Sequence, residues 1–415
     1  MTAVDSRSVV VVGAGLGGLT VAEELRRLGF GGSVVLVGAE HEAPYDRPPL
    51  SKEVLKGTRS NPPSLREPDE LDALGLDLRL GTVACGVDTA ARRVRLRGGG
   101  ELPYDVLVVA TGARARGWDA AGGASNVWSL RTAQDAARIG AAVARGGSIG
   151  VLGAGFIGCE VAASAREAGC EVTLVEVQSA PLAHALGPEA GAEIARRHRA
   201  AGVDVRCGVT IVDADLAGDV LTGVRLSDGT GVTLDGLVVG LGVVPDTGWL
   251  EGSGIAVDNG VVCDASGRTS QEGVYAVGDV ARWVNARTGR HRRIEHWTTT
   301  IEQAAIVASD ITGQERRVLD EVPYFWSDQY GTKIQCVGEP DAGADITVRM
   351  TGADGDRPLY LYSQAGALTG VLGFGLARVV MRLRALVAER AALGDALDLV
   401  DELYPRASAL TNSPT

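Results

Sequence analysis

The chain has 415 residues, 45% of them apolar, and a net charge of −12 at pH 7. This length predicts about two or three domains, each with its own core. The acidic balance argues against general binding of nucleic acid or of anionic membranes, because both need a positive field. No signal peptide is recognised, and no apolar run approaches the roughly 18 residues of a membrane span. The six cysteines are scattered without a C-x-x-C motif, which predicts a cytoplasmic protein without a zinc or cluster site.

Residues 9–40 are predicted to form a strand, a glycine loop, a helix and a second strand. The loop reads GAGLGG, with Gly13, Gly15 and Gly18 in the glycine positions of the motif and Leu16 at a variable position expected to contact the cofactor. In a G-x-G-x-x-G loop the first glycine allows a tight turn, the second admits a pyrophosphate, and the third lets the helix pack on the strand. Glu40 follows the second strand, where an acid accepts hydrogen bonds from ribose hydroxyls. The alternative for Glu40 is an ordinary exposed loop residue.

Two further segments of the first unit carry distinctive residues. Residues 44–52, PYDRPPLSK, form a rigid proline turn with Arg47 and Lys52. Residues 104–112, YDVLVVATG, form a buried strand whose end lets the backbone pass close to a nucleotide. The residues at that end are Ala110, Thr111 and Gly112. A core strand and its turn are the plain interpretation of the same pattern.

A second copy of the nucleotide-binding pattern begins near residue 148. Its loop reads GAGFIG, with Gly153, Gly155 and Gly158 in the glycine positions of the motif and Ile157 at a variable position expected to contact the cofactor. The unit ends in TLVE, with Glu176 at the strand tip, and residues 237–245, LVVGLGVVP, repeat the small strand end at Gly242. Two such loops in the same context predict two dinucleotides held face to face, as hydride transfer between nicotinamide and flavin requires.

The last part of the chain has a different pattern. Residues 273–283, GVYAVGDVARW, predict a strand that ends at Gly278 and Asp279. From about residue 318 short strands follow, and then a helix near 376–390, which predicts a separate α+β cap. The predicted strands are 334–337, 346–350, 359–363 and 369–372. The tail after Tyr404 is rich in Pro, Ser and Thr, which predicts fraying.

Together these segments resemble the two-dinucleotide flavoprotein superfamily that includes glutathione reductase. The finer similarity is to NADH-dependent ferredoxin reductases of bacterial monooxygenase and dioxygenase systems, of the putidaredoxin reductase and biphenyl dioxygenase reductase type. The words that carry it are GAGLGG, YDRPPLSK, VLVVATGA, SLRT, GAGFIGCE, VYAVGDVA, IEHW and FWSDQY. YDRPPLSK and FWSDQY are much more specific than the glycine loops.

The resemblance implies an α/β fold with two Rossmann-like dinucleotide-binding domains, for FAD and NAD, and a C-terminal α+β domain. It implies FAD in the first site, NADH in the second, and a small iron–sulfur ferredoxin that passes electrons to an oxygenase of the cytochrome P-450 or Rieske type. The NAD domain interrupts the FAD domain in this family. The expected boundaries are 1–117 and 244–317 for the FAD domain, 118–243 for the NAD domain, and 318–415 for the C-terminal domain.

The family places Lys52 and Glu160 beside the flavin. A cation near flavin N5 favours the reduced anion, and a carboxylate positions that cation. The alternative is an unrelated surface lysine and a glutamate in the first helical turn, stabilised by the helix dipole. Asp279 contacts the ribityl or pyrophosphate region in the family, and the alternative is that it caps the following helix.

The resemblance also assigns two arginines and two tryptophans. Arg47 and Arg131 are expected at the FAD phosphates or ribityl chain, because a guanidinium fork suits phosphate, although surface arginines are common. Trp297 and Trp326 hold aromatic positions around the isoalloxazine, and Trp326 shields it where ferredoxin docks. The alternative for both tryptophans is a plain core position.

Glu176 predicts NADH as the preferred cofactor. A carboxylate at this strand tip accepts from the 2′-hydroxyl and repels a 2′-phosphate. Residues 177–179 offer no arginine for NADPH.

Two rival functions and one docking question remain open. A disulfide or peroxide reductase needs a redox cysteine within 44–52, and that segment has none. A non-enzymatic redox sensor, like the apoptosis-inducing flavoproteins, is the other rival. Ferredoxin docking is expected to use arginines near Trp326 and Trp297, although charged runs are usually solvated faces. The candidates are Arg316, Arg317, Arg378, Arg382 and Arg384, with Arg287, Arg290, Arg292 and Arg293 beside Trp297.

Overall fold

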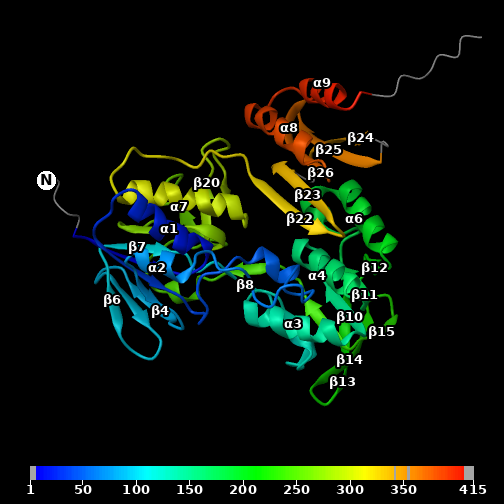
Figure 1. Cartoon of the computed structure of the whole chain (residues 1–415), viewed down its shortest axis with the longest axis horizontal. Coiled ribbons are helices and arrows are strands. Elements are labelled where there is room, and N and C mark those ends of the chain that lie inside the picture. Colours follow the sequence, from blue (N-terminus) through cyan, green and yellow to red (C-terminus); the bar gives the residue numbers. More distant parts are fainter. Residues whose placement is uncertain (1–5, 341–342, 353–355, 406–415) are drawn as a thin grey trace, which may run out of the picture.

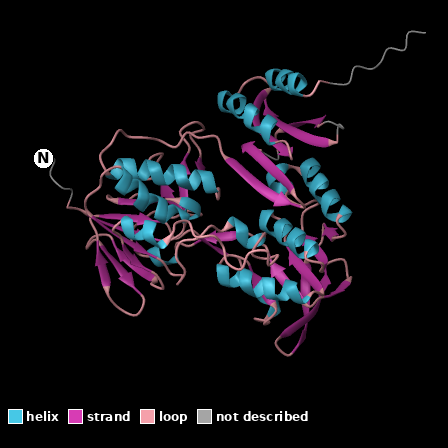
Figure 2. Ribbon diagram, viewed as in Figure 1, coloured by secondary structure: helices cyan, strands magenta, loops and turns pink. Residues whose placement is uncertain are grey.

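The structure is a computed structural model that describes residues 6–340, 343–352 and 356–405. Two parallel sheets and one antiparallel sheet make up its three main parts (Figures 1 and 2). Helices α1, α2 and α7 lie together on one side of the molecule, although α7 comes late in the chain (Figure 1). The green part around α4 and β10 and the orange part around α8 lie on the other side (Figure 1). In these described ranges no helix combines the length and apolar character that crossing a bilayer requires.

The first parallel sheet has the strand order β19-β7-β1-β2-β3. Its strands are β1 (Ser8–Val12), β2 (Ser33–Val37), β3 (Asp77–Arg79), β7 (Val106–Val109) and β19 (Val274–Ala276). After Ser8, strand β1 consists of four buried valines in the centre of the sheet, as expected for a parallel strand covered on both faces. Helix α1 (Leu16–Arg27) packs against α7 (Trp297–Ile311), although the end of α1 and the start of α7 lie 270 positions apart in the sequence.

Smaller elements surround this first sheet. They are η1 (Pro48–Ser51), α2 (Pro68–Ala73), β4 (Ala84–Asp88), β5 (Arg93–Leu96), β6 (Glu101–Pro103), β18 (Val261–Cys263), η4 (Gly278–Val280), β20 (Ala281–Val284) and β21 (His291–Arg292). The proline turn of residues 44–52 is therefore a short 3-10 helix. Its two prolines occupy the first helical positions, where their fixed φ is favourable.

The second parallel sheet has the order β12-β11-β10-β16-β9. Its elements are β9 (Val127–Ser129), α3 (Ala133–Arg145), β10 (Ser148–Leu152), α4 (Phe156–Glu167), β11 (Glu171–Glu176), α5 (Ala183–Leu186), α6 (Pro188–Ala200), β12 (Asp204–Cys207) and β16 (Gly236–Val239). Three antiparallel strands extend from it: β13 (Ile211–Ala217), β14 (Val220–Leu226) and β15 (Gly231–Thr233). In both parallel sheets the strand before the glycine loop is central, which places the two loops at equivalent positions.

Two crossing segments join the parallel sheets. Strand β8 (Ala113–Ala115) leaves the first unit, and β17 (Val243–Pro245) returns from the second, as an antiparallel pair. The short helices η2 (Asp119–Ala121) and η3 (Gly248–Leu250) follow these strands. Strand β19, which comes after the return, completes the edge of the first sheet.

The C-terminal part is an antiparallel sheet of order β22-β23-β26-β25-β24 with two helices. Its elements are β22 (Tyr324–Gln329), β23 (Thr332–Gly338), β24 (Asp345–Thr351), β25 (Arg357–Gln364), β26 (Ala367–Phe374), α8 (Ala377–Glu389) and α9 (Leu393–Leu403). One face packs on the second parallel unit, where the Tyr362 hydroxyl donates to the Leu186 carbonyl at 2.7 Å. The other face packs on α8 and α9.

The predicted α+β cap is confirmed, with two additions. All four expected strands and the expected helix are present, but the sequence interpretation missed β22 and α9. The fraying predicted for the tail concerns residues 406–415, which lie outside the described part of the chain.

Candidate functional site

A cavity of about 680 Å³ lies where the first glycine loop meets the second unit and the C-terminal sheet. Its walls include the loop at Gly15, the proline turn at Lys52, helix α4 at Glu160 and strand β22 at Trp326. This volume lies within the usual range of small-molecule sites, roughly 300 to 1,000 Å³. Ligand binding here would therefore involve all three parts of the molecule.

The first glycine loop has a separate geometric reason for each glycine. A Cβ atom on Gly13, where φ is +117°, would lie 2.0 Å from the Ala110 carbonyl oxygen. A Cβ on Gly18 would lie 1.9 Å from the Gly13 oxygen. Gly15 is different, because a Cβ there would meet nothing within 4 Å. Gly15 therefore leaves open space beside the backbone at the start of α1, which suits an approaching phosphate.

The second glycine loop repeats this geometry. A Cβ on Gly153 or Gly158 would lie 2.5 or 2.0 Å from a backbone oxygen, whereas one on Gly155 would meet nothing within 4 Å. Gly242, with φ of +82°, is likewise open. Leu16 and Ile157 both line the cavity, but Leu16 is half-buried whereas Ile157 is 46% exposed.

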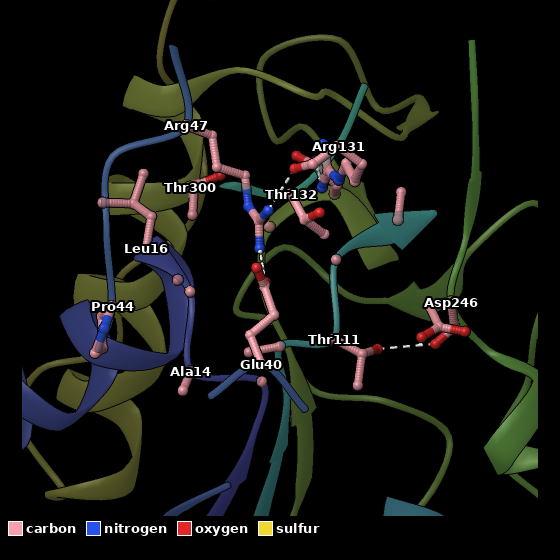
Figure 3. Close-up of a pocket in the computed structure, with 18 of the residues that line it drawn as sticks. Ala14, Leu16, Glu40, Pro44, Arg47, Thr111, Arg131, Thr132, Asp246 and Thr300 are labelled. Atoms are coloured by element: carbon pink, nitrogen blue, oxygen red, sulfur yellow. Dashed lines mark hydrogen bonds and ion pairs between the residues drawn. The ribbon is translucent and has the colours of Figure 1, made fainter. Parts of the chain in front are cut away.

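The strand end at Ala110, Thr111 and Gly112 lines the cavity. The Thr111 hydroxyl donates to the Asp246 carbonyl at 2.8 Å, which ties the outgoing crossing segment to the returning one (Figure 3). Gly112 has φ of +69°, in the left-handed region that glycine tolerates.

Glu40 and Arg47 form an ion pair at the cavity wall. Arg47 Nη2 lies 2.6 Å from Glu40 Oε1 (Figure 3). The other Glu40 oxygen accepts a hydrogen bond from the Tyr45 hydroxyl at 2.5 Å. Burial, together with the Glu40 carboxylate, raises the pKa of Tyr45 to about 12 against the opposing effect of Arg47. The two residues were expected to contact different parts of a nucleotide, and the structure brings them together.

Arg131 and Asp279 form a second ion pair, with 2.8 Å between Nη2 and Oδ2. Both line the cavity, from the start of α3 and from η4. Asp279 is the second residue of η4, whose N-cap position is held by Val277. The Gly278 amide donates to the Gln303 side chain at 2.8 Å, which fixes this turn to α7.

Lys52 and Glu160 form the most buried of these pairs. Lys52 Nζ lies 2.8 Å from Glu160 Oε2, with side-chain exposures of 11% and 4%. Lys52 is therefore not an unrelated surface residue. Glu160 is the fifth residue of α4, beyond the first turn in which it was expected. The stabilisation by a helix dipole is confined to the first turn, so it does not explain this carboxylate.

Sequence interpretation missed two hydroxyls at this pair. Ser51 and Ser327 both donate to the Glu160 carboxylate, at 2.5 and 2.7 Å. The available signal was that each serine belongs to one of the two most specific words, PPLSK and FWSDQY.

Trp297 and Trp326 meet at the cavity with 6.4 Å between ring centroids. The Trp297 indole N–H donates to Asp46 at 3.1 Å. The Trp326 ring stacks on Tyr324, and Lys333 Nζ lies 5.6 Å from the centroid of the Trp326 ring. Neither tryptophan is fully buried, which separates them from a core residue such as Trp283.

Strand β22 separates two environments. Successive side chains of a strand point to opposite faces. Phe325 contacts Phe156 of the second glycine loop, with centroids 4.7 Å apart, whereas its neighbour Trp326 contacts Trp297 and Tyr324. The adjacent residues Phe325 and Trp326 therefore contact the second glycine loop and the tryptophan side of the cavity, respectively.

His296 lies between the cavity and a second cavity of about 730 Å³. Its ring packs beside Phe325 at 5.1 Å, and burial lowers the pKa of His296 to about 4. Phe156 and the four arginines of residues 287–293 line this second cavity. Arg292 and Arg293 are paired there with Glu339 and Glu295.

Glu176 ends β11 as expected, and its carboxylate is engaged by the backbone. One oxygen accepts from the Ala154 amide at 2.7 Å and the other from the Gln178 amide at 2.8 Å. Ala154 is the middle residue of the second G-A-G turn, so Glu176 also fixes the loop. Val177 beside it is 62% exposed.

The remaining arginine candidates fall into three groups. Arg316 and Arg317 form ion pairs with Asp264 and Glu302, at 2.9 and 2.7 Å. Arg378 and Arg382 are exposed on α8 and form no ion pair with another described residue. Arg384 reaches the Val322 carbonyl at 3.4 Å.

Cysteine chemistry has no place in the cavity. Among its described lining residues none is cysteine. Burial raises the pKa of the Cys159 thiol far above its usual value, so this thiol, next to Glu160 in the chain, stays protonated.

Family comparison finds two matching models. The pyridine nucleotide-disulphide oxidoreductase model matches residues 7–304, and the reductase C-terminal model matches residues 324–405. The first covers more than half of the chain, and the second coincides with the antiparallel sheet and its helices.

Individual relatives agree with these models. The ferredoxin–NAD(+) reductase component of the anthranilate 1,2-dioxygenase system of Burkholderia cepacia is 36% identical over 94% of this chain and 96% of its own. Putidaredoxin reductase of Pseudomonas putida is 36% identical over 84% of each chain. The crystal structure of a covalent putidaredoxin reductase–putidaredoxin complex matches with a TM-score of 0.90 and 34% identity, covering 96% of this chain and 97% of that one.

Proposed function

Because the chain belongs to the pyridine nucleotide-disulphide oxidoreductase family, we propose that it is a FAD-dependent NADH:ferredoxin oxidoreductase. It takes electrons from NADH and delivers them to a small iron–sulfur ferredoxin that serves an oxygenase. The observation that carries this proposal is the shared cavity of Lys52, Glu160 and Trp326, with no cysteine among its described lining residues. Relatives named as ferredoxin reductases of oxygenase systems support it.

The cavity suits FAD in its donor set and shape. Gly15 leaves the backbone open where a pyrophosphate would meet the start of α1, and the strand ends at Ala110 and Gly278 bring further backbone to the wall. Three ion pairs, Glu40–Arg47, Arg131–Asp279 and Lys52–Glu160, supply polar groups of both signs. Bound FAD would supply the chemistry that joins hydride transfer to one-electron transfer.

Lys52 is the residue that acts on the hydride step. Its ammonium lies in a buried site, where a fixed charge acts more strongly than in water. Glu160 holds that ammonium, and the pair needs no rearrangement when negative charge develops beside it. No general base is required, because hydride transfer to a flavin moves no separate proton from the protein.

Trp326 and Trp297 form the other side of the site. Their rings are close to each other and only partly buried, so they bring the cavity near the molecular surface. Lys333, which lies 3.6 Å from Asp328, and the exposed arginines Arg378 and Arg382 of α8 belong to the C-terminal domain and would offer positive charge to an acidic ferredoxin. Charge of this kind raises association rates more than affinity.

The second glycine loop is the proposed NADH site. Gly155 is open as Gly15 is, and the exposed Ile157 and Leu241 offer apolar surface beside it. The Glu176 carboxylate keeps a negative charge at the strand tip, which disfavours a 2′-phosphate. Phe156 and Phe325 connect this side to the cavity.

The test is reduction of a ferredoxin by the FAD-loaded protein. Putidaredoxin is the probe, and cytochrome c is the terminal acceptor. We expect NADH-driven cytochrome c reduction that requires the ferredoxin, with ferricyanide reduced in its absence. NADH-driven reduction of a disulfide or a peroxide, with no transfer to ferredoxin, would support the rival disulfide or peroxide reductase instead.

A further inference from the structure

Three buried donors converge on the carboxylate of Glu160. Lys52 Nζ and Ser51 Oγ donate to Oε2 at 2.8 and 2.5 Å, and Ser327 Oγ donates to Oε1 at 2.7 Å. Ser51, Glu160 and Ser327 are 1%, 3% and 0% exposed. Hydrogen bonds shielded from water in this way are strong, and a missing one is costly.

The direction of the Ser327 bond is fixed by its neighbour. Gln329 Nε2 donates to Ser327 Oγ at 3.1 Å, so the single hydroxyl proton of Ser327 is directed to Glu160. Ser327 and Gln329 lie on the same face of β22 and are both buried. The C-terminal sheet therefore presents a pre-oriented donor to α4.

Within the part of the chain that the structure describes, the Ser327 hydroxyl forms hydrogen bonds with Gln329 and Glu160 alone. The Glu160 carboxylate in turn accepts hydrogen bonds from Ser51, Lys52 and Ser327 alone among these residues. The terminal torsion of a glutamate side chain, which sets the plane of its carboxylate, has a broad distribution with little intrinsic preference. Donors on both oxygens fix the carboxylate plane, and Ser327 is the donor to Oε1. The orientation of that plane sets where the Lys52 ammonium lies.

We propose that Ser327 is a positioning residue for the reaction: it acts on the bound flavin through Glu160 and Lys52 without touching the flavin itself. This inference rests on the proposed function, because it concerns a flavin in the cavity. It makes the C-terminal sheet a part of the site for the hydride step, in addition to the exit side marked by Trp326.

The experiment measures the midpoint potential of bound FAD in Ser327→Ala, by reduction against a reference dye without NADH or ferredoxin. Loss of the hydroxyl lets Glu160 draw Lys52 away, so the reduced form is stabilised less. We expect a three- to tenfold shift toward the oxidised form, which is about 15 to 30 mV for a two-electron couple. Ser327→Thr, which keeps the hydroxyl, should restore the potential.

Two controls separate positioning from loss of packing. Ser363→Ala removes another buried hydroxyl, 2% exposed, from the same sheet and should leave the potential unchanged. In a Lys52→Met background, Ser327→Ala should cause no further shift. An unchanged potential in Ser327→Ala, or an equal shift with and without Lys52, would overturn the inference.

The outcome also distinguishes this inference from the proposed function. Thermal unfolding of each variant shows whether the fold is kept. A folded parent protein that binds no FAD would refute the proposed function and with it this role of Ser327. A flavin-binding parent whose potential ignores Ser327 would refute only the role of Ser327.

Discussion

The two glycine loops have the same backbone geometry and different surroundings. In each loop, a Cβ atom on the first or third glycine would clash with a backbone oxygen, whereas a Cβ on the second would meet nothing within 4 Å. Around the first loop the walls come from three parts of the chain and enclose a cavity. Around the second, Ile157, Val177 and Leu241 remain exposed. The loop geometry provides for a dinucleotide, and the surroundings decide whether it is enclosed and resident or open and exchanging.

The largest expected effects come from matched substitutions at the two open glycines. Gly15 and Gly155 have φ of −88° and −72°, so a side chain strains neither backbone. Gly15→Val should give a folded protein whose FAD affinity is about a hundredfold or more lower, a loss of roughly 3 kcal/mol. Gly155→Val should keep FAD and lower kcat/KM for NADH by a similar factor.

Absorbance of the isolated protein and NADH kinetics measure these two losses. Loss of FAD from both variants, or from neither, would remove the distinction between a resident and an exchanging site. Gly13→Ala serves as the folding control, because its Cβ would lie 2.0 Å from the Ala110 oxygen and should destabilise the first unit.

Lys52→Met tests the chemistry of the enclosed site. Removal of a preorganised charge should slow flavin reduction by about a hundredfold while NADH binding at the other site stays the same. Stopped-flow reduction over a range of NADH concentrations separates the limiting rate from the dissociation constant. If the limiting rate is unchanged, Lys52 has a structural role only.

Glu176→Gln tests the selectivity of the open site. The amide keeps the size of the side chain and removes the charge, so the preference for NADH over NADPH should narrow by about tenfold. Adding Gln178→Arg to Glu176→Gln should narrow the preference for NADH further or reverse it in favour of NADPH. The ratio of kcat/KM for the two cofactors measures this preference. Equal efficiency of the parent protein with both cofactors would contradict a role for Glu176.

The bonds of Glu176 to Ala154 and Gln178 explain why Glu176→Ala is the less informative substitution. It removes the charge and also both acceptors that hold the second loop. A fall in activity with NADH would then mix lost binding with a loosened loop.

The smallest expected effect concerns the docking arginines. Arg382→Glu should slow ferredoxin-dependent turnover by about three- to tenfold at low salt, because exposed charges are screened beyond roughly 10 Å at 0.1 M. Arg316→Glu should have less effect, since Arg316 is already paired with Asp264. Ferricyanide reduction should persist in both variants and at high salt. Equal loss of the ferricyanide and ferredoxin reactions would mean that these arginines maintain the fold or the flavin site.

Local patterns predicted most of the fold. The apolar runs before GAGLGG and GAGFIG became the central strands β1 and β10, and the expected strands of the C-terminal sheet are present. Strand β22 was missed because its buried face carries the polar residues Ser327 and Gln329, so its sequence does not alternate between apolar and polar residues. Helix α9 was missed because only Ala396 and Val400 of it are fully buried.

Long-range pairings could not be predicted from spacing alone. Glu40, Arg47, Arg131 and Asp279 were each expected to contact a nucleotide, and the structure pairs them with one another, since partly buried charges need partners. The Ser327–Glu160 bond joins residues 167 positions apart. No local period records such a contact, although the family words PPLSK and FWSDQY contained both serines.

The central claim is that a flavin enclosed in the first site takes a hydride from NADH at the second and releases single electrons. An anaerobic titration of the FAD-loaded protein tests it most directly. We predict that one NADH per FAD fully reduces the protein, and that the reduced protein, freed of NAD(H), then reduces two molecules of putidaredoxin. Transfer to ferredoxin only while NADH remains present, or reduction of a disulfide in its place, would contradict the account.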